Sequence, residues 1–268
     1  MLRKKTYPEV HSLEQIEMVC SDSDLNCRAV AVLKYARSVF VLTGAGISAE
    51  SGIPTFRGTD GLWRNYSAEQ LATADAFQKD PRLIWDWYHW RQSVILKAEP
   101  NLAHHALVLL EQAVERFLLL TQNVDNLHRR AGSKNVLELH GNIFWARCSS
   151  CGRRAEHVSG EESTGDLPTC ECGELLRPDV VWFGETIPAD VWHASLDFLS
   201  HADVAIICGT SGVVWPAAAI PGIACGQGVK TIEVNVEPTA ISSIVDVSIT
   251  GKATEVLPDL LHRLTAES

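Results

Sequence analysis

The sequence predicts an α/β fold, in which helices cover both faces of a parallel sheet and a smaller lobe is attached to it. Short apolar runs alternate along the chain with stretches of helical periodicity. Continuous apolar runs are typical of strands that are buried on both faces, as in parallel sheets. Two long segments interrupt this alternation, and they predict the smaller lobe. A chain of 268 residues is long enough to form both parts.

The expected elements follow one another through most of the chain. Strands are predicted at 39–42, 117–121, 136–139, 180–183, 204–208, 231–234 and 247–250. Helices are predicted at 28–36, 102–115, 189–199 and 253–264. Because parallel sheets bind ligands at the carboxyl ends of their strands, residues that directly follow a strand are the first candidates for a site.

The same pattern suggests how the chain is divided. Residues 1–28 are expected to be a polar N-terminal extension, and the main domain is expected to comprise 29–58, 102–145 and 177–268. A Trp-rich helical insertion at 59–101 and a cysteine-bearing module at 146–176 are expected to form the small lobe together.

Composition and charge narrow the possible partners. The formal net charge of −10 argues against a broad basic face, so no nucleic-acid partner is expected. No apolar run approaches the ~20 residues that span a bilayer, and no secretory h-region follows the basic N-terminus. We therefore expect a cytoplasmic protein without a membrane partner, and a monomer.

A glycine-rich loop follows the strand at 39–42. Gly44, Gly46 and Ala49 have the G-x-G-x-x-G/A spacing of a dinucleotide fingerprint. Its glycines allow a tight turn and a close approach of pyrophosphate, and a following helix would direct free N–H groups at the phosphates. The main domain is therefore expected to be Rossmann-like. The loop continues through 52–58 with its own glycine, proline and arginine, which an ordinary dehydrogenase does not need.

Four cysteines are clustered. Cys148 and Cys151 form a C-x2-C pair, and Cys170 and Cys172 form a C-x-C pair. Two close pairs of thiolates suit one tetrahedral Zn²⁺, and four cysteines leave no open position, so this zinc would be structural. The glycines at 152 and 173 would allow the tight turns. The alternatives are four unrelated thiols or a redox pair.

Six motifs, in this order, resemble the sirtuins, the NAD-dependent protein deacylases. They lie at 42–58, 122–128, 139–141, 177–185, 209–211 and 235–237. The resemblance extends from about residue 39 to the C-terminal helix. The second cysteine pair departs from the C-x2-C that the family usually has, which puts the zinc affinity in doubt.

The resemblance implies a reaction and a general base. The acyl oxygen of a modified lysine would attack C1′ of the NAD ribose as nicotinamide leaves, and a base would then activate a ribose hydroxyl. The products would be lysine, nicotinamide and an O-acyl-ADP-ribose. Among ten histidines, His140 matches the family's base and directly follows a predicted strand. Imidazole suits this role because its pKa is close to neutral.

The resemblance also implies the residues that bind NAD. Asn123 and Asp125 would act with His140 in catalysis by holding the nicotinamide pocket, although Asp125 could also simply cap a helix. Phe56 would shield C1′ from water, and Arg57 would bind phosphate or be an ordinary surface arginine. The implied set is Gly44, Ala45, Gly46, Ser48, Glu50, Thr55, Phe56, Arg57, Trp63, Gln122, Asn123, Asp125, Gly209, Thr210, Ser211, Asn235, Val236, Glu237 and Ala253.

Two segments are candidates for binding acylated lysine side chains of other proteins. Residues 181–185 and 212–215 look like extended edges that face one gap, where a peptide could add as a strand. The residues expected to bind substrate there are Val181, Phe183, Gly184 and Glu185.

Tyr88 and Arg91 bear on the acyl group. They are three residues apart and share one face of a predicted helix. This pair, and the string at 71–77, resemble the desuccinylase and demalonylase branch of the family, where a Tyr and an Arg bind the acyl carboxylate. Ala45 would leave room for a larger acyl group. We therefore expect removal of succinyl, malonyl or glutaryl groups, with acetyl handled less well. The alternative is a Trp-rich packing helix with an incidental arginine.

Two other functions use the same features. An ADP-ribosyltransferase would share the first half of the reaction, and a non-catalytic sensor of NAD or ADP-ribose would share only the binding. Asn123, Asp125 and His140 are all in place, which favours deacylation.

Overall fold

The structure is a computed structural model that describes residues 24–54, 66–157 and 166–266. Its larger part is built on a six-stranded sheet of order β3-β2-β1-β7-β8-β9, in which every neighbouring pair is parallel. The strands are β1 (Ser38–Thr43), β2 (Arg116–Thr121), β3 (Val136–Glu138), β7 (Val204–Cys208), β8 (Lys230–Asn235) and β9 (Val247–Thr250). These are the strands predicted for the parallel sheet, apart from the one at 180–183.

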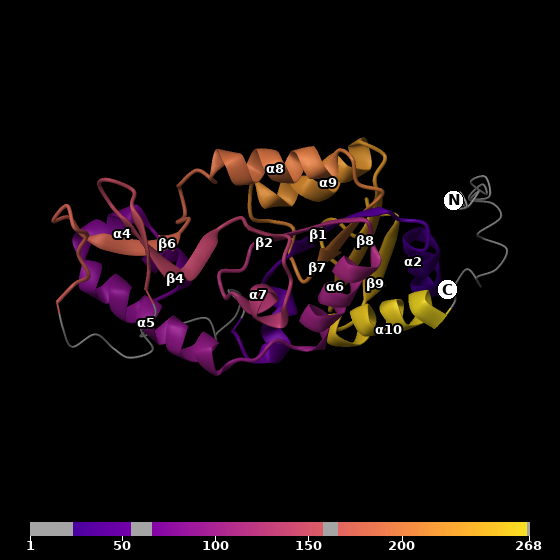
Figure 1. The fold of residues 1–268 in the computed structure, drawn as a ribbon, viewed down its shortest axis with the longest axis horizontal. Helices are drawn as coiled ribbons and strands as arrows, with labels where there is room; N and C mark the ends of the chain where they lie inside the picture. The colour runs from indigo at the N-terminus through magenta and orange to yellow at the C-terminus, as the bar shows by residue number, and fades with distance from the viewer. Residues whose placement is uncertain (1–23, 55–65, 158–165, 267–268) are drawn as a thin grey trace, which may run out of the picture.

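Helices cover both faces of this sheet (Figure 1). One face is covered by α2 (Leu25–Leu33), α6 (Leu102–Ala113) and α10 (Ala253–Ala266), and the other by α8 (Ala189–Leu199) and α9 (Ile220–Gly226). Along β1, Val39 and Val41 pack with the first group, and Phe40 and Leu42 with the second. Because side chains alternate between the faces of a strand, an entirely apolar strand is needed to supply both cores.

The smaller lobe has its own core, at the opposite end of the molecule from α2 and α10 (Figure 1). It contains α3 (Ala68–Leu71), α4 (Ala74–Lys79), α5 (Pro81–Lys97) and a sheet of β5 (Arg154–Glu156), β4 (Gly141–Cys148) and β6 (Leu176–Val180). The long helix α5 begins where the Asp80 carboxylate accepts the N–H of Leu83, with Pro81 at the first position. Trp85 and Trp87 of this helix are buried in the same core as Phe144 and Ala146 of β4.

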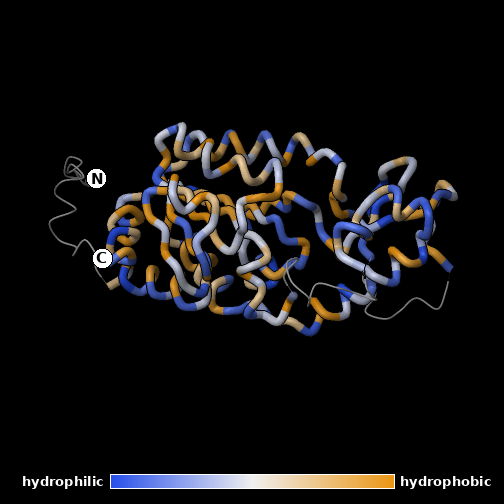
Figure 2. Tube along the Cα trace, turned by 180° about the vertical axis from the view of Figure 1, so that it is seen from behind, coloured by the Kyte–Doolittle hydropathy of each residue, from blue (hydrophilic) through white to orange (hydrophobic). Residues whose placement is uncertain are grey.

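Hydropathy along the chain differs between the helices and the central strands of the large sheet (Figure 2). The helices alternate between apolar and polar residues, whereas the central strands are almost wholly apolar. None of the described helices is both long and apolar enough to span a membrane.

The strand predicted at 180–183 is wrong. The strand found there is β6, which ends at Val180 and pairs antiparallel with β4 in the small sheet. From Val181 onward the backbone bonds to other partners: the N–H of Val181 donates to the carbonyl of His140, and that of Phe183 to Ala72. A turn with Gly184 at φ +86° then ends the extended segment.

Candidate active site

The fingerprint loop lies between β1 and the end of β7. It contains two short 3-10 turns, Ala45–Ile47 and Ala49–Ser51, and no α-helix follows the fingerprint in the described residues up to Pro54. The second turn is stopped by Gly52, which has a φ of +84°. The N–H groups of Gly44 and Gly46 are also not free for phosphate, because they donate to the carbonyls of Cys208 and Gly209 at 3.0 and 2.8 Å.

Both fingerprint glycines are required by this contact between loops. A Cβ on Gly44 would lie 2.8 Å from the oxygen of Gly209, and one on Gly46 would lie 2.8 Å from its Cα. The turn after β1 is therefore packed backbone to backbone against the turn after β7. This places Thr210 and the fingerprint loop at the same edge of the sheet, where β1 is flanked by β2 and β7.

Ser48, Asn123 and Asp125 form one buried group. The Ser48 hydroxyl donates to Oδ2 of Asp125 at 2.7 Å, and the Asn123 amide donates to Ser48 Oγ at 3.2 Å and to the carbonyl of Gly44 at 3.1 Å. All three side chains are less than a tenth exposed. The residues that follow β2 are thus bonded directly to the loop that follows β1.

The Asp125 carboxylate has two different roles. Oδ1 accepts the N–H of Leu127 at 2.9 Å, at the start of α7 (Leu127–Ala131), while Oδ2 faces Ser48. Burial raises the pKa of Asp125 above its usual value, and these two hydrogen bonds oppose the shift. The helix-cap interpretation describes Oδ1, whereas the role of this residue in a nicotinamide pocket stays a prediction.

His140 lies at the junction of the two sheets, between β3 and β4. Its Nδ1 is 3.0 Å from the carbonyl oxygen of Gln122, which can only accept, so Nδ1 carries the proton and Nε2 keeps a lone pair. Burial lowers the pKa of His140. The imidazole is held as a neutral base whose free nitrogen points away from Gln122.

A chain of polar contacts joins the other strand ends. The Gln122 amide donates to Thr210 Oγ1 at 2.9 Å, and the Asn235 amide donates to the Thr210 carbonyl at 2.8 Å. Ser211 is half-buried, whereas Val236 and Glu237 are exposed beyond Asn235. Ala253 is buried at the start of α10, next to Thr254, whose hydroxyl donates to Glu50. Glu50 also pairs with Lys252 at 2.9 Å.

Two buried histidines, His104 and His128, lie next to this edge, and no role is predicted for them from the sequence. Nε2 of His128 lies 2.9 Å from Thr43 Oγ1, which bonds Thr121 Oγ1 at 2.9 Å. The ring of His104 is 4.8 Å from that of His128. His128 belongs to the motif at 122–128, and its place directly after a strand end was the available signal.

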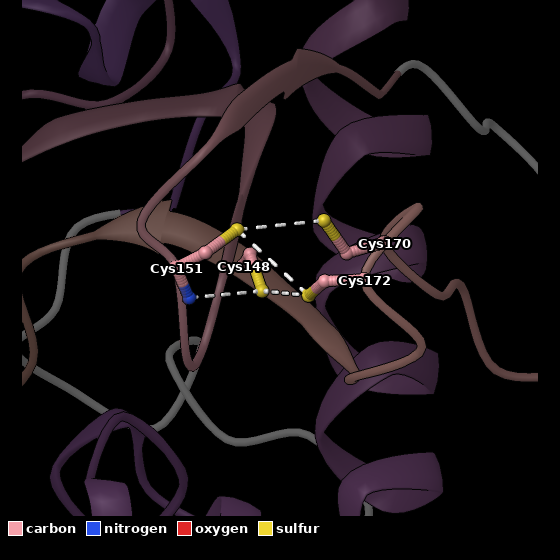
Figure 3. A group of neighbouring side chains, drawn as sticks. All are labelled: Cys148, Cys151, Cys170 and Cys172. Atoms are coloured by element: carbon pink, nitrogen blue, oxygen red, sulfur yellow. Dashed lines mark hydrogen bonds between the residues drawn. The ribbon is translucent and has the colours of Figure 1, made fainter.

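The four clustered cysteines converge as predicted (Figure 3). Their sulfur atoms all lie within 4.8 Å of one another, with closest separations of 3.5 to 3.8 Å. Four sulfurs at Zn–S bonds of about 2.3 Å stand about 3.8 Å apart in a tetrahedron, so the set fits zinc despite the shortened C-x-C pair. Gly152 and Gly173 have φ of +72° and +93°.

Backbone donors prepare one of these sulfurs. The N–H groups of Cys151 and Ser150 donate to Cys148 Sγ, each at 3.4 Å, and they lower the pKa of Cys148 to about 6. A thiolate is the form that binds a metal.

Tyr88 and Arg91 lie on the side of α5 that faces the site. Tyr88 is fully buried, and Arg91 is half-buried with its guanidinium carbon 5.1 Å from the centre of the Trp87 ring. Burial lowers the pKa of Arg91, and interactions with Tyr88 and Asp125 oppose this. Arg91 therefore lies near enough to Tyr88 and Asp125 to interact with both side chains.

The two segments predicted to bind peptide are not regular strands in the structure. Both expose apolar side chains, namely Phe183 on one and Val213, Val214 and Trp215 on the other. Glu185 is occupied within the protein: its carboxylate pairs with Arg177 and accepts the N–H of Trp182 at 2.9 Å. The candidates Thr55, Phe56, Arg57 and Trp63 lie outside the described residues.

Comparison with known proteins agrees with this arrangement. The model of the Sir2 family matches residues 44–216. An NAD-dependent protein deacylase of Thermococcus kodakarensis is 54% identical over 246 residues, covering 88% of this chain and 94% of the relative. One of Aquifex aeolicus is 51% identical over 218 residues, covering 81% and 90%.

Solved structures give the same result. A Sir2 homologue described as an NAD complex has a TM-score of 0.85 at 46% identity, covering 90% of this chain and 94% of that one. A structure described as Sir2 with a p53 peptide and NAD has a TM-score of 0.79 at 34% identity, covering 90% and 98%. With this identity and this coverage, the chain belongs to the Sir2 family, the sirtuins.

Proposed function

We propose that this protein is an NAD-dependent protein-lysine deacylase that prefers acyl groups ending in a carboxylate. The deacylase activity is supported by the two relatives named above, both of which are NAD-dependent protein deacylases. It is also supported by a related Sir2 structure that is described as a complex with 2′-O-acetyl ADP-ribose. The preference rests on one observation: Arg91 and Tyr88 lie on one face of α5, with Arg91 close enough to Asp125 to interact with its charge.

In the proposed reaction NAD is a substrate. The acyl oxygen bonds to C1′ of the ribose while the bond from C1′ to nicotinamide breaks. A ribose hydroxyl, losing its proton to Nε2 of His140, then attacks the acyl carbon. The lysine amine then leaves the acyl carbon and water adds there, so that the bond between the acyl carbon and the oxygen on C1′ breaks, giving lysine and O-acyl-ADP-ribose. His140 suits this step because its Nδ1–H is held by Gln122, which leaves Nε2 unprotonated.

The group of Ser48, Asn123 and Asp125 supports the cleavage of nicotinamide. An amide and a carboxylate held rigidly against the fingerprint loop can orient the carboxamide and favour the positive charge that develops on the ribose. The four cysteines would fill all four positions of a tetrahedral zinc ion, which leaves no position for a reacting group. The metal would therefore stabilise the small lobe and take no part in the chemistry.

The acyl preference follows from how a half-buried guanidinium recognises a carboxylate. A guanidinium that is partly removed from water gains most from a carboxylate, which can accept two parallel N–H bonds. An acetyl group offers no such partner. Succinyl, malonyl and glutaryl lysine all end in a carboxylate, so they form one substrate class for this pocket.

The test compares kcat/KM on succinyl-lysine and acetyl-lysine versions of one peptide. Arg91→Met should lower the succinyl value by about 10- to 100-fold, since hydrogen bonds to charged groups contribute about 1.5–3 kcal/mol, and should leave the acetyl value within about twofold. Arg82→Met is the matched control, because Arg82 is exposed on the same helix. Equal loss on both substrates would make Arg91 a structural residue.

Mass spectrometry of the products separates the proposed activity from its alternatives. A deacylase yields O-acyl-ADP-ribose and free lysine, an ADP-ribosyltransferase yields modified protein, and a sensor yields neither. The cytoplasmic location and the monomeric state stay predictions from the sequence.

A further inference from the structure

A tryptophan holds the hydroxyl of Tyr88. Nε1 of Trp182 donates to Tyr88 Oη at 2.9 Å, and the two side chains are 2% and 0% exposed. Trp182 belongs to the segment that follows β6, whereas Tyr88 lies in the middle of α5. One hydrogen bond therefore joins the helix that carries the acyl-pocket residues to the segment predicted to bind the peptide.

The direction of this hydrogen bond determines whether the Tyr88 hydroxyl can donate its own proton to another group. An indole N–H can only donate, whereas a phenol hydroxyl can both donate and accept. The Tyr88 oxygen accepts from Trp182, so its own proton is left for another partner. Within the described parts of the chain no group accepts that proton. Burial raises the pKa of Tyr88, so the hydroxyl keeps its proton at neutral pH.

Trp182 is itself held firmly. The guanidinium carbon of Arg177 lies 3.3 Å from the centre of its ring, and Arg177 is paired with Glu185. The same glutamate accepts the backbone N–H of Trp182 at 2.9 Å. The centre of the Phe77 ring is also 5.4 Å from that of Trp182. The indole cannot turn away from Tyr88 without breaking several of these contacts.

We infer that Trp182 is a positioning residue for acyl recognition: by donating to Tyr88, it directs the tyrosine proton toward the carboxylate of an acidic acyl group beside Arg91. This inference rests on the proposed acyl preference. An acetyl group has no acceptor at that place, so only acidic acyl groups should respond to the loss of the indole N–H.

The first test is Trp182→Phe, which removes the donor and keeps an aromatic ring. The ratio of kcat/KM on succinyl- and acetyl-lysine peptides should fall about 3- to 10-fold, as expected for the loss of one hydrogen bond. The KM for the succinyl peptide should rise, while that for NAD stays unchanged. A misfolded fraction lowers both activities equally, so the ratio reports on the folded enzyme.

Trp85→Phe is the matched control. Trp85 is 1% exposed in the same lobe and donates from Nε1 to the carbonyl of Leu176 at 3.0 Å, so the same kind of hydrogen bond and a similar volume are lost. Its ratio should equal that of the wild type.

Two further measurements examine the bond itself. In a Tyr88→Phe background, Trp182→Phe should cause no additional fall in the ratio, because the two changes remove one interaction. In spectra of ¹⁵N-labelled protein, one of the eight indole N–H signals should move when wild type is compared with Tyr88→Phe. This comparison does not require the Trp182 variant to fold.

The outcomes are distinguishable. Equal loss on both peptides, an additional fall in the double variant, or indole signals that do not move would overturn the role of Trp182. If Arg91→Met and Tyr88→Phe lower the ratio but Trp182→Phe does not, only this inference fails. If Arg91→Met leaves the ratio unchanged, the proposed acyl preference fails instead.

Discussion

The backbone contact between the turns after β1 and β7 makes Gly46 the most sensitive position of the fingerprint loop. In Gly46→Ala the new methyl group would meet Cα and the oxygen of Gly209 at 2.8 Å, and both are backbone atoms that no rotamer change can move. Real Cβ contacts are longer than this, so one of the two turns must shift. Forcing one extra methyl group into a packed site costs about 1–3 kcal/mol.

Gly222→Ala is the control, and it should change the stability in the opposite direction to Gly46→Ala. Gly222 is exposed within α9, and a Cβ there would have no heavy atom within 4 Å. Alanine in a helix is about 0.5–1 kcal/mol more favourable than glycine. For a protein of this size 1 kcal/mol moves Tm by about 2–4 °C. Gly46→Ala should therefore lower Tm by about 2–12 °C, and Gly222→Ala should raise it by about 1–4 °C.

The assay is thermal unfolding of both variants, combined with the KM for NAD. Gly46→Ala should raise this KM, because the displaced turn carries Ser48 and the carbonyl of Gly44, to which Asn123 is bonded. Gly222→Ala should leave it unchanged. If Gly46→Ala has wild-type stability and a wild-type KM, the two turns do not pack as described.

Three other predictions follow from the site. His140→Ala should abolish turnover, and because burial lowers the pKa of His140, the fall of kcat/KM on acidification should begin below the ordinary histidine pKa of about 6.5, which a pH–rate profile checks. Cys170→Ser or prolonged chelation should release zinc and loosen the small lobe, seen in metal content and tryptophan fluorescence; a chelated protein with unchanged fluorescence would refute this. Burial lowers the pKa of His104 to about 4, so the unfolded chain takes up a proton first and stability should fall between about pH 6.5 and 4 by up to about 3 kcal/mol; His104→Gln should flatten that fall in denaturant titrations.

The parallel sheet could be predicted because each of its strands must fill two cores. The apolar run at 204–208 coincides with β7, and the run at 247–250 with β9. The strands of the small sheet carry no such signal. β4 is only partly apolar, with Asn142 and Arg147 inside it, and β5 is exposed throughout. β6 contains Pro178, which a sequence rule allows only in an edge strand or a bulge, and β6 does lie at the edge of the small sheet.

The site was predictable to a similar extent. Residues that follow strand ends were identified, and Gln122, His140 and Thr210 do meet at one edge of the sheet. What the sequence could not predict are contacts between distant segments. The short 3-10 turns after β1 depend on carbonyls of the β7 loop, and the occupation of Glu185 depends on Arg177. Such contacts are set by packing, which leaves no local pattern.

The strand β4 has a further consequence. It begins at Gly141, directly after His140, and ends at Cys148, one of the four sulfur ligands. Eight residues of extended chain span about 26 Å, so a single strand connects the cysteine cluster to His140. A zinc ion held by the four cysteines would therefore constrain, through β4, the position of His140, the proposed proton acceptor.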